Sequence, residues 1–242
     1  MMKVSEYVLD RVNKFQVGYV FTYTDFGLPA KDADAVMKAL NRMVKSGKIK
    51  KLSKGKFYKP KNSQFGELKP DIYQVVKDLL EKDGKIIGYI TGYSIYSQLG
   101  LTTQVYNTIQ IGVNREKKAT KRGMYKIKFI KQPNKIKKEN IPLLRILDSI
   151  RNIKKIPDTT VENSCIRLKA IINDLEMSDQ EMLIKLALKY NPATRALVGA
   201  IIENVNSKLD TENLYKSLNP ATSYSFKISE KTLPNQHKWF IK

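Results

Sequence analysis

The apolar positions in the first 30 residues predict two short helices separated by a turn. The first helix is expected over residues 5–13, because Ser5 is a suitable N-cap and apolar side chains follow at helical spacing. Those side chains are Val4, Val8, Leu9 and Val12. After Gly18, Thr24 is placed to cap a brief second helix that ends before Pro29.

A third and longer helix is predicted over residues 31–46, with Gly47 as the left-handed residue that follows its end. One face has apolar residues at i, i+3, i+4, i+7 and i+8, namely Val36, Ala39, Leu40, Met43 and Val44. The opposite face is basic and polar, and consists of Lys31, Lys38, Asn41, Arg42 and Lys45. The pattern therefore predicts a helix with one side in a core and the other side in solvent.

Residues 48–58 predict a two-stranded hairpin that turns at residues 53–55. Ile49 and Leu52 flank two lysines, and Phe57 follows the turn. The basic residues of this hairpin that we expect to contact DNA are Lys48, Lys51, Lys54 and Lys56. Three helices followed by a basic hairpin is the order of a winged helix-turn-helix, in which one helix enters a DNA groove and the hairpin touches the flanking backbone.

The remainder of the chain predicts a mixed α/β region with a mainly helical second half. Residues 60–70 are polar, contain two prolines and a glycine, and are expected to form a linker. Helices are expected over residues 71–82 and 92–99, the second capped by Thr91, and strands over 105–113 and 125–130, joined by a basic loop. Further helices are expected over residues 141–153, 161–175, 180–190 and 194–205. The predicted class is α+β, with a DNA-binding domain at residues 1–61 and a second, effector domain at residues 68–242.

Charge supports a polyanionic partner. The chain carries 44 Lys and Arg against 23 Asp and Glu, a formal net charge of +21. Residues 1–61 alone hold 14 basic and 5 acidic residues, and the excess is weakest after residue 140. A concentrated excess of this kind favours nucleic acid, whose binding is then salt-dependent. The alternative interpretation of any single lysine is an ordinary solvated surface residue.

The residue types on the third helix match the chemistry of major-groove recognition. An arginine such as Arg42 can form two hydrogen bonds to guanine, and an asparagine such as Asn41 can form two to adenine. Lysines hold phosphates and position the protein without reading sequence. We therefore expect double-stranded DNA, as an operator, to be the partner of this face.

Residues for catalysis or metal binding are sparse. His237 is the single histidine and Cys165 the single cysteine, so a zinc site or a nucleophile–histidine pair would lack partners. We expect His237 on the surface and Cys165 in the core of its helix. No phosphate-binding P-loop motif is present, because the glycines at positions 84, 88 and 92 lack a following Lys-Ser or Lys-Thr. We expect no enzyme activity, catalytic residue, metal or cofactor.

Two further features concern location. No run of 18 apolar residues occurs, so no membrane partner is expected. The first residues also lack the apolar run of a signal peptide, and a lone cysteine permits no internal disulfide. The expected location is the cytoplasm.

The whole chain resembles bacterial AbiEi-type antitoxins, a family of winged-helix abortive-infection proteins. The stretch ALNRMVKSGKIKKLSKGKFY at residues 39–58 is similar to their winged helix, and GYSIYSQLGLT at residues 92–102 to the start of their second domain. The resemblance implies that the winged helix represses its own operon. It also implies that the second domain counteracts a nucleotidyltransferase-like toxin encoded beside it in a toxin–antitoxin system of phage defence.

Two other functions fit the same composition. One is a transcription regulator whose second domain senses a ligand. The other is a metal-dependent nuclease that acts on DNA delivered by the basic domain, although no D-x-x-D or E-x-K arrangement lies in a convincing strand. The neighbouring gene separates antitoxin from sensor, and metal-dependent cleavage of DNA separates the nuclease from both.

Overall fold

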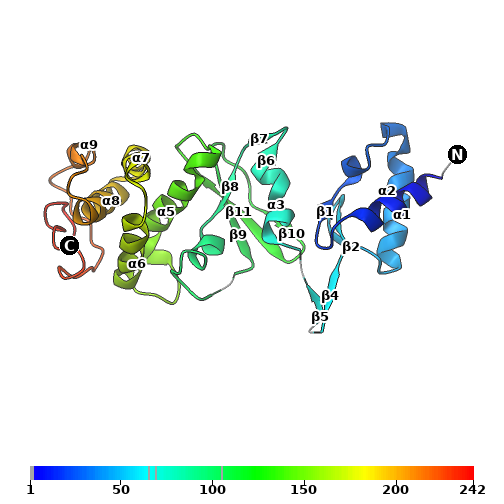
Figure 1. The fold of residues 1–242 in the computed structure, drawn as a ribbon, viewed down its shortest axis with the longest axis horizontal. Helices are drawn as coiled ribbons and strands as arrows, with labels where there is room; N and C mark the ends of the chain where they lie inside the picture. The colour runs from blue at the N-terminus through cyan, green and yellow to red at the C-terminus, as the bar shows by residue number, and fades with distance from the viewer. Residues whose placement is uncertain (1–2, 65, 69, 105) are drawn as a thin grey trace. The chain divides into compact units, whose positions relative to one another are not determined.

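A computed structural model describes residues 3–64, 66–68, 70–104 and 106–242 (Figure 1). The chain divides into two compact units. The first unit contains Met1–Asp78 and Thr120–Lys126, and the second contains Leu79–Ala119 and Ile127–Lys242. Helix accounts for 45% and strand for 15% of the structure, which confirms the α+β class. Within the described residues, every helix is too short or too polar to cross a membrane.

The first unit begins with four helical segments. They are α1 (Val4–Lys14), the 3-10 turns η1 (Tyr23–Phe26) and η2 (Ala30–Asp32), and α2 (Ala33–Lys45). The cap of η1 is Thr22 rather than the expected Thr24: the backbone N–H and hydroxyl of Thr22 both bond to the Asp25 carboxylate. The local Thr-x-x-Asp arrangement therefore determines where this turn begins.

A three-stranded antiparallel sheet closes the same unit. Its strands are β1 (Val20–Phe21), β2 (Lys50–Ser53) and β3 (Lys56–Tyr58), in the order β1-β3-β2. The register pairs Phe57 with both Phe21 and Lys51, and Gly55 makes the turn with a φ of 71°. The hairpin predicted from residues 48–58 is thus present.

Aromatic residues fill the core between the helices and this sheet. The ring of Phe21 lies 4.9 Å from that of Phe15 and 6.0 Å from that of Phe26. Val8 and Leu40, from α1 and α2, are fully buried against the same cluster. Burial of such side chains contributes roughly 1.5–3 kcal/mol each, which is what holds α2 in place.

Residues 60–70, which were expected to form a linker, contain a short hairpin. Strands β4 (Lys61–Ser63) and β5 (Gly66–Leu68) pair as an antiparallel hairpin, with Ser63 opposite Gly66. The helix that follows is α3 (Ile72–Leu80), and β6 (Glu81–Lys82) and β7 (Lys85–Ile86) form another short hairpin. The glycine and polar residues of this stretch therefore belong to a paired hairpin. Their composition alone does not distinguish a hairpin from an unpaired linker.

The central sheet has the order β10-β11-β9-β8. These strands are β8 (Tyr89–Thr91), β9 (Thr108–Val113), β10 (Thr120–Arg122) and β11 (Tyr125–Lys131). Thr91 was expected to cap a helix, but it is the fully buried last residue of β8 and pairs with Gln110. Helix α4 (Tyr93–Tyr96) instead begins after Gly92, whose φ of 64° turns the chain. Residue 105, the first residue of the expected strand, lies outside the described residues.

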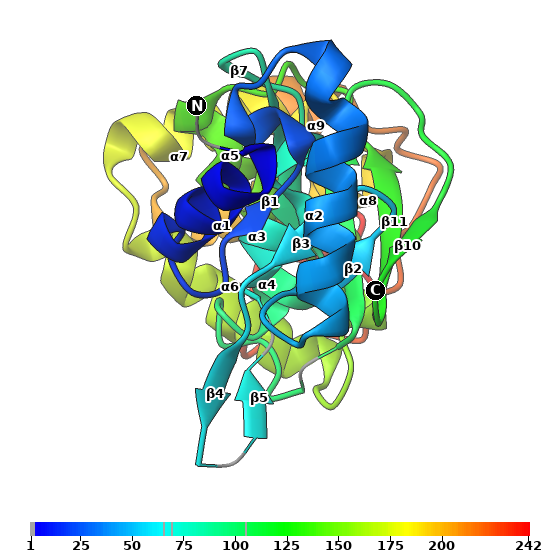
Figure 2. The ribbon, with the colours of Figure 1, turned by 90° about the vertical axis from the view of Figure 1, so that its right-hand side faces the viewer.

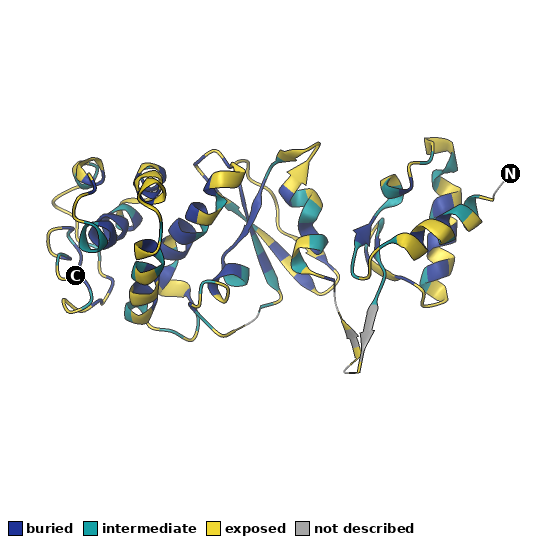
Figure 3. Ribbon diagram, viewed as in Figure 1, coloured by how far each residue is buried: buried dark blue, intermediate teal, exposed yellow. Residues whose placement is uncertain are grey.

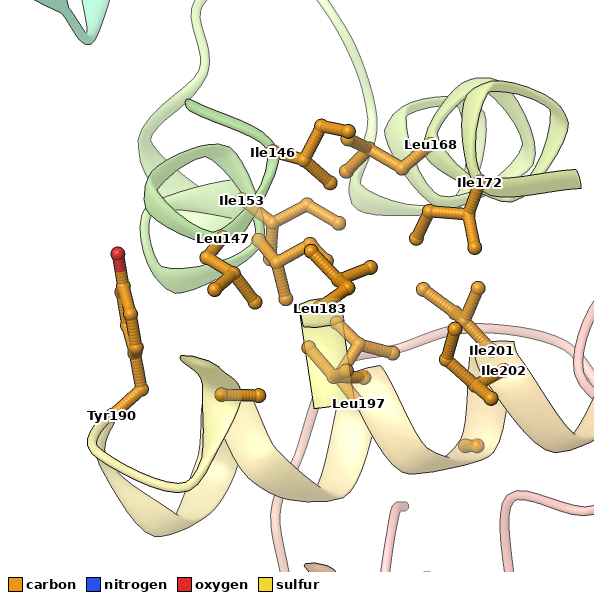
Figure 4. Close-up of a cluster of buried hydrophobic side chains, with 14 of the residues drawn as sticks. Ile146, Leu147, Ile153, Leu168, Ile172, Leu183, Tyr190, Leu197, Ile201 and Ile202 are labelled. Atoms are coloured by element: carbon orange, nitrogen blue, oxygen red, sulfur yellow. The ribbon is translucent and has the colours of Figure 1, made fainter. Parts of the chain in front are cut away.

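Five further helices lie in the described part of the second unit, of which the first four correspond to the helices predicted over residues 141–205 and the fifth was not predicted. They are α5 (Ile141–Arg151), α6 (Val161–Asn173), α7 (Met177–Ala187), α8 (Pro192–Val205) and α9 (Glu212–Lys216). Their facing apolar side chains form one cluster, in which Leu147, Leu168, Leu183 and Leu197 are fully buried (Figure 4). This cluster is separate from the core of the first unit.

Candidate nucleic-acid interface

Helix α2 buries one face and exposes the other (Figure 3). Its buried residues are Val36, Ala39, Leu40 and Met43, and Val44 is half-buried. The helix ends at Lys45, Ser46 is its C-cap, and Gly47 follows with a φ of 75°. A side chain with a Cβ is strained at such a φ, so Gly47 fixes the point at which the chain leaves the helix and enters β2.

The predicted basic face is brought together in space. Lys38, Asn41, Arg42 and Lys45 all line one hollow of about 540 Å³, together with Val4, Ser5 and Ala35; Figure 2 shows the helices α1 and α2 to which most of these residues belong. All four are exposed, and none forms a side-chain hydrogen bond or ion pair with another described residue. Lys31 is also exposed but precedes α2, in η2. We call Lys38, Asn41, Arg42 and Lys45 the α2 face.

The first turn of α1 forms the other wall of this hollow. Val4 and Ser5 line it, and sequence analysis had assigned them only to the apolar stripe and the N-cap. The cap prediction for Ser5 is also wrong, because α1 begins at Val4 and Lys3 occupies the N-cap position. The positive dipole end of a helix favours negative charge, but Glu6 lies in this first turn and its carboxylate accepts a hydrogen bond from the backbone N–H of Lys3, so this wall adds little positive potential to the α2 face.

Two members of the α2 face have a second physical role. Arg42 and Lys45 lie in the last turn of α2, and Asp34 lies in its first. That distribution complements the helix dipole, with a stabilisation of about 0.3–1 kcal/mol for each charge. Lys38 and Asn41 are mid-helix and lack this role. The helix dipole therefore does not account for Lys38 and Asn41, which are exposed and have no partner among the described residues.

The hairpin β2–β3 presents three of its four predicted lysines to solvent. Lys48, Lys51 and Lys54 are exposed and, within the described part of the chain, their ammonium groups have no carboxylate partner. Lys54 occupies the turn before Gly55. These three side chains are available for contacts with phosphate groups.

Lys56 differs from the other predicted residues. Its side chain is only 18% exposed, and its Nζ lies 3.1 Å from Oδ2 of Asp78. Asp78 also accepts hydrogen bonds from Arg122, at 2.5 Å from Nη1 to Oδ1 and 2.9 Å from Nη2 to Oδ2. Lys56 is thus held inside the first unit, and we leave it out of the proposed contact surface.

The environment of Asp78 favours its charged form. Burial raises the pKa of this carboxyl, but the hydrogen bonds from Arg122 and Lys56 outweigh burial, so the pKa lies below its usual value. Arg122 also donates to the backbone O of Val75 at 2.8 Å. This clamp of Lys56, Asp78 and Arg122 joins β3, α3 and β10. Sequence reasoning missed it, because 44 residues separate Asp78 from Arg122.

The second unit contains a buried polar cluster around Asp148 of α5. Its Oδ2 accepts hydrogen bonds from Tyr89 at 2.5 Å and Thr91 at 2.8 Å, and its Oδ1 accepts one from Tyr190 at 2.9 Å. Gln132 donates from Nε2 to both tyrosine oxygens. Burial raises the pKa of Asp148, and these hydroxyl donors oppose the rise. Since every oxygen has a partner, we interpret the cluster as a structural tie between β8, α5 and the end of α7.

The two residues singled out for chemistry lie where the sequence predicted. His237 is exposed, with its Nε2 2.7 Å from Oε1 of Glu230. Cys165 is fully buried in α6, and burial raises the pKa of its thiol to about 12. Among the described residues, no group of three or more His, Cys, Asp or Glu side chains is arranged to hold a metal ion.

Comparison with known proteins gives one match. A family model described as a family of unknown function, DUF6088, matches residues 7–183. The chain belongs to this family. No curated protein and no solved structure matches the chain. The DUF6088 match includes the α2 face, the β2–β3 hairpin and the Asp78–Arg122 clamp, and it ends within α7.

Proposed function

We propose that this protein is a DNA-binding regulator whose first unit is a winged helix-turn-helix. The order of elements supports this: α1, β1, η1, α2, and then the hairpin β2–β3, with β1 pairing against β3. In such modules the helix before the hairpin enters the major groove, and the hairpin contacts the flanking phosphates. Here α2 occupies the recognition position.

The observation that carries the proposal is the unpaired α2 face. Four adjacent polar or basic side chains line one hollow without partners inside the described chain. These side chains are suited to two kinds of contact with DNA. Arg42 and Asn41 are suited to base edges, while Lys38 and Lys45, with Lys51 and Lys54 of the hairpin, are suited to phosphates.

The test is selection of duplex DNA by the full-length protein from a random-sequence pool, followed by affinity measurements over a range of salt. We expect a defined sequence to be enriched and log affinity to fall linearly with log salt, by roughly 0.9 for each phosphate contacted. The Arg42→Ala variant should lose the enriched sequence. The matched control is Arg11→Ala, which removes an exposed arginine from the last turn of α1. Failure to enrich any sequence, or equal loss by both variants, contradicts the proposal.

We further propose that the protein acts as an antitoxin against a nucleotidyltransferase-like toxin encoded beside it. This part rests on the resemblance to AbiEi-type antitoxins. The test is co-expression of the full chain with the adjacent gene. Rescue of growth by the Arg42→Ala variant would assign antitoxin activity to the protein apart from repression. Rescue by the unsubstituted chain alone would leave transcriptional repression as the mechanism, and absence of a toxic neighbour would overturn the antitoxin role.

A further inference from the structure

A cavity of about 320 Å³ lies in the second unit, where α5 ends, α8 begins and the C-terminal segment returns. This volume is at the lower end of the roughly 300–1,000 Å³ typical of small-molecule sites. Its lining consists of Ile150, Arg151, Asn152, Ile153, Lys154, Lys155, Asn191, Ala193, Thr194, Ser223, Tyr224, Ser225 and Phe226.

Every charged side chain in this lining is basic. It includes Arg151, Lys154 and Lys155 and no carboxylate. No side chain of these three forms an ion pair with a described residue: Arg151 reaches only a backbone oxygen, that of Lys131 at 3.5 Å, and the Nζ of Lys154 lies 5.0 Å from the ring centroid of Phe226. Asp148, one turn before Arg151 on α5, attracts Arg151 electrostatically and offsets part of its charge, but Asp148 does not line the cavity.

A larger hollow beside α6, of about 700 Å³, does not have an excess of basic side chains in its lining. Glu162 and Asp174 line it together with Lys169 and Lys231, so its charges are balanced. Three cations that share a cavity repel one another, and an anion relieves that repulsion. Of these two cavities in the second unit, the smaller is therefore the one whose charges favour an anionic ligand.

The opposite wall is held rigidly and offers hydroxyl groups. Backbone hydrogen bonds tie Tyr224 and Phe226 to the chain end: Tyr224 N–H to Phe240 O at 2.7 Å, and Phe226 N–H to Lys242 O at 2.8 Å. The side chains of Ser223 and Ser225 are exposed and have no hydrogen-bond partner among the described residues. Tyr224 is half-buried and Phe226 buried, so an aromatic and apolar surface lies beside the cations.

We propose that this cavity binds a small phosphorylated organic molecule of about mononucleotide size. Its phosphate groups pair with Arg151, Lys154 and Lys155 and accept hydrogen bonds from the serine hydroxyls. Its organic part lies against Tyr224 and Phe226. Arginine and lysine beside free hydroxyl groups is the donor set that phosphate oxygens favour. The site uses no residue of the α2 face, so it stands apart from the DNA-binding proposal.

The experiment is calorimetric titration of the full-length protein, at fixed moderate salt, with ATP, AMP, glucose 6-phosphate, inorganic pyrophosphate and adenosine. We expect at least one of the three phosphorylated organic molecules to bind more tightly than pyrophosphate, and adenosine not to bind. Preference for ATP and AMP would identify a nucleotide as the ligand, and preference for glucose 6-phosphate would identify a sugar phosphate.

The double variant Lys154→Gln, Lys155→Gln should weaken that binding at least tenfold. The matched control, Lys185→Gln, Lys208→Gln, removes two exposed lysines elsewhere in the same unit and should change affinity less than twofold. The proposal is overturned if none of the three phosphorylated organic molecules binds at millimolar concentration or if both double variants behave alike. It is also overturned if a short single-stranded oligonucleotide shows this lysine dependence while the small ligands do not bind.

Discussion

We expect substitutions in the α2 face and in the β2–β3 hairpin to change DNA binding in different ways. Asn41→Ala and Arg42→Ala should relax sequence preference, each at a cost of about 1–3 kcal/mol at the preferred site, because two hydrogen bonds to a base edge are lost. The measurement is affinity for the selected sequence and for single-base variants of it. Lys54→Ala, at the hairpin turn, should instead weaken binding to all sequences about equally. A changed sequence preference with Lys54→Ala and none with Arg42→Ala would reverse the assigned roles.

Tyr190 gives a residue-scale prediction in the second unit. Its hydroxyl donates to Oδ1 of Asp148 and accepts from Gln132, so Tyr190→Phe leaves two buried polar groups short of a partner. We expect the free energy of unfolding to fall by about 1–3 kcal/mol. The control is Tyr215→Phe, a half-buried tyrosine of the same unit whose hydroxyl forms no hydrogen bond with a described residue. If urea unfolding shows the same loss of free energy for both variants, the hydrogen bonds of the Asp148 cluster contribute nothing to stability.

At the scale of elements, the clamp of Lys56, Asp78 and Arg122 predicts a pH dependence. The folded-state pKa of Asp78 is lowered, so its contribution to stability is present above the unfolded value of 3.8 and is lost as the pH falls below it. Asp78→Asn should therefore lower the free energy of unfolding at neutral pH. It should also make that free energy depend less on pH in the acid range, which we call the acid limb. Asp10→Asn, at an exposed ion pair on α1, is the control and should leave that limb unchanged. An acid limb identical in Asp78→Asn and the unsubstituted protein would contradict the assignment.

Elements set by local pattern were predictable, and those set by distant partners were not. Helix α2 follows from the 3.6-residue spacing of its apolar residues, and the β2–β3 hairpin follows from a turn between apolar positions. Thr91 was misassigned because its place in β8 depends on pairing with β9 and on the carboxylate of Asp148, 57 residues away. The basic charge of Lys56 gave no indication that Asp78 would hold it.

At the scale of the whole molecule, the two separate cores predict two unfolding events. Leu40 belongs to the core of the first unit and Leu197 to that of the second, and both are fully buried. Replacement of either by alanine should cost about 2–5 kcal/mol in its own unit. In scanning calorimetry, Leu40→Ala should lower one transition and Leu197→Ala the other. A single transition that both substitutions shift equally would show that the units unfold together.

Because Thr120–Lys126 belongs to the first unit, that unit is complete only when residue 126 has been synthesised. A ribosome adding about 5–20 residues per second takes roughly 2–9 s to travel the 44 residues between Asp78 and Arg122. During that interval the nascent chain carries Lys56 of the hairpin and Asp78 of α3 without the arginine that binds Asp78. A message that stops early, even well beyond residue 78, would therefore release α2 and the β2–β3 hairpin without the ion pair that Arg122 forms with Asp78.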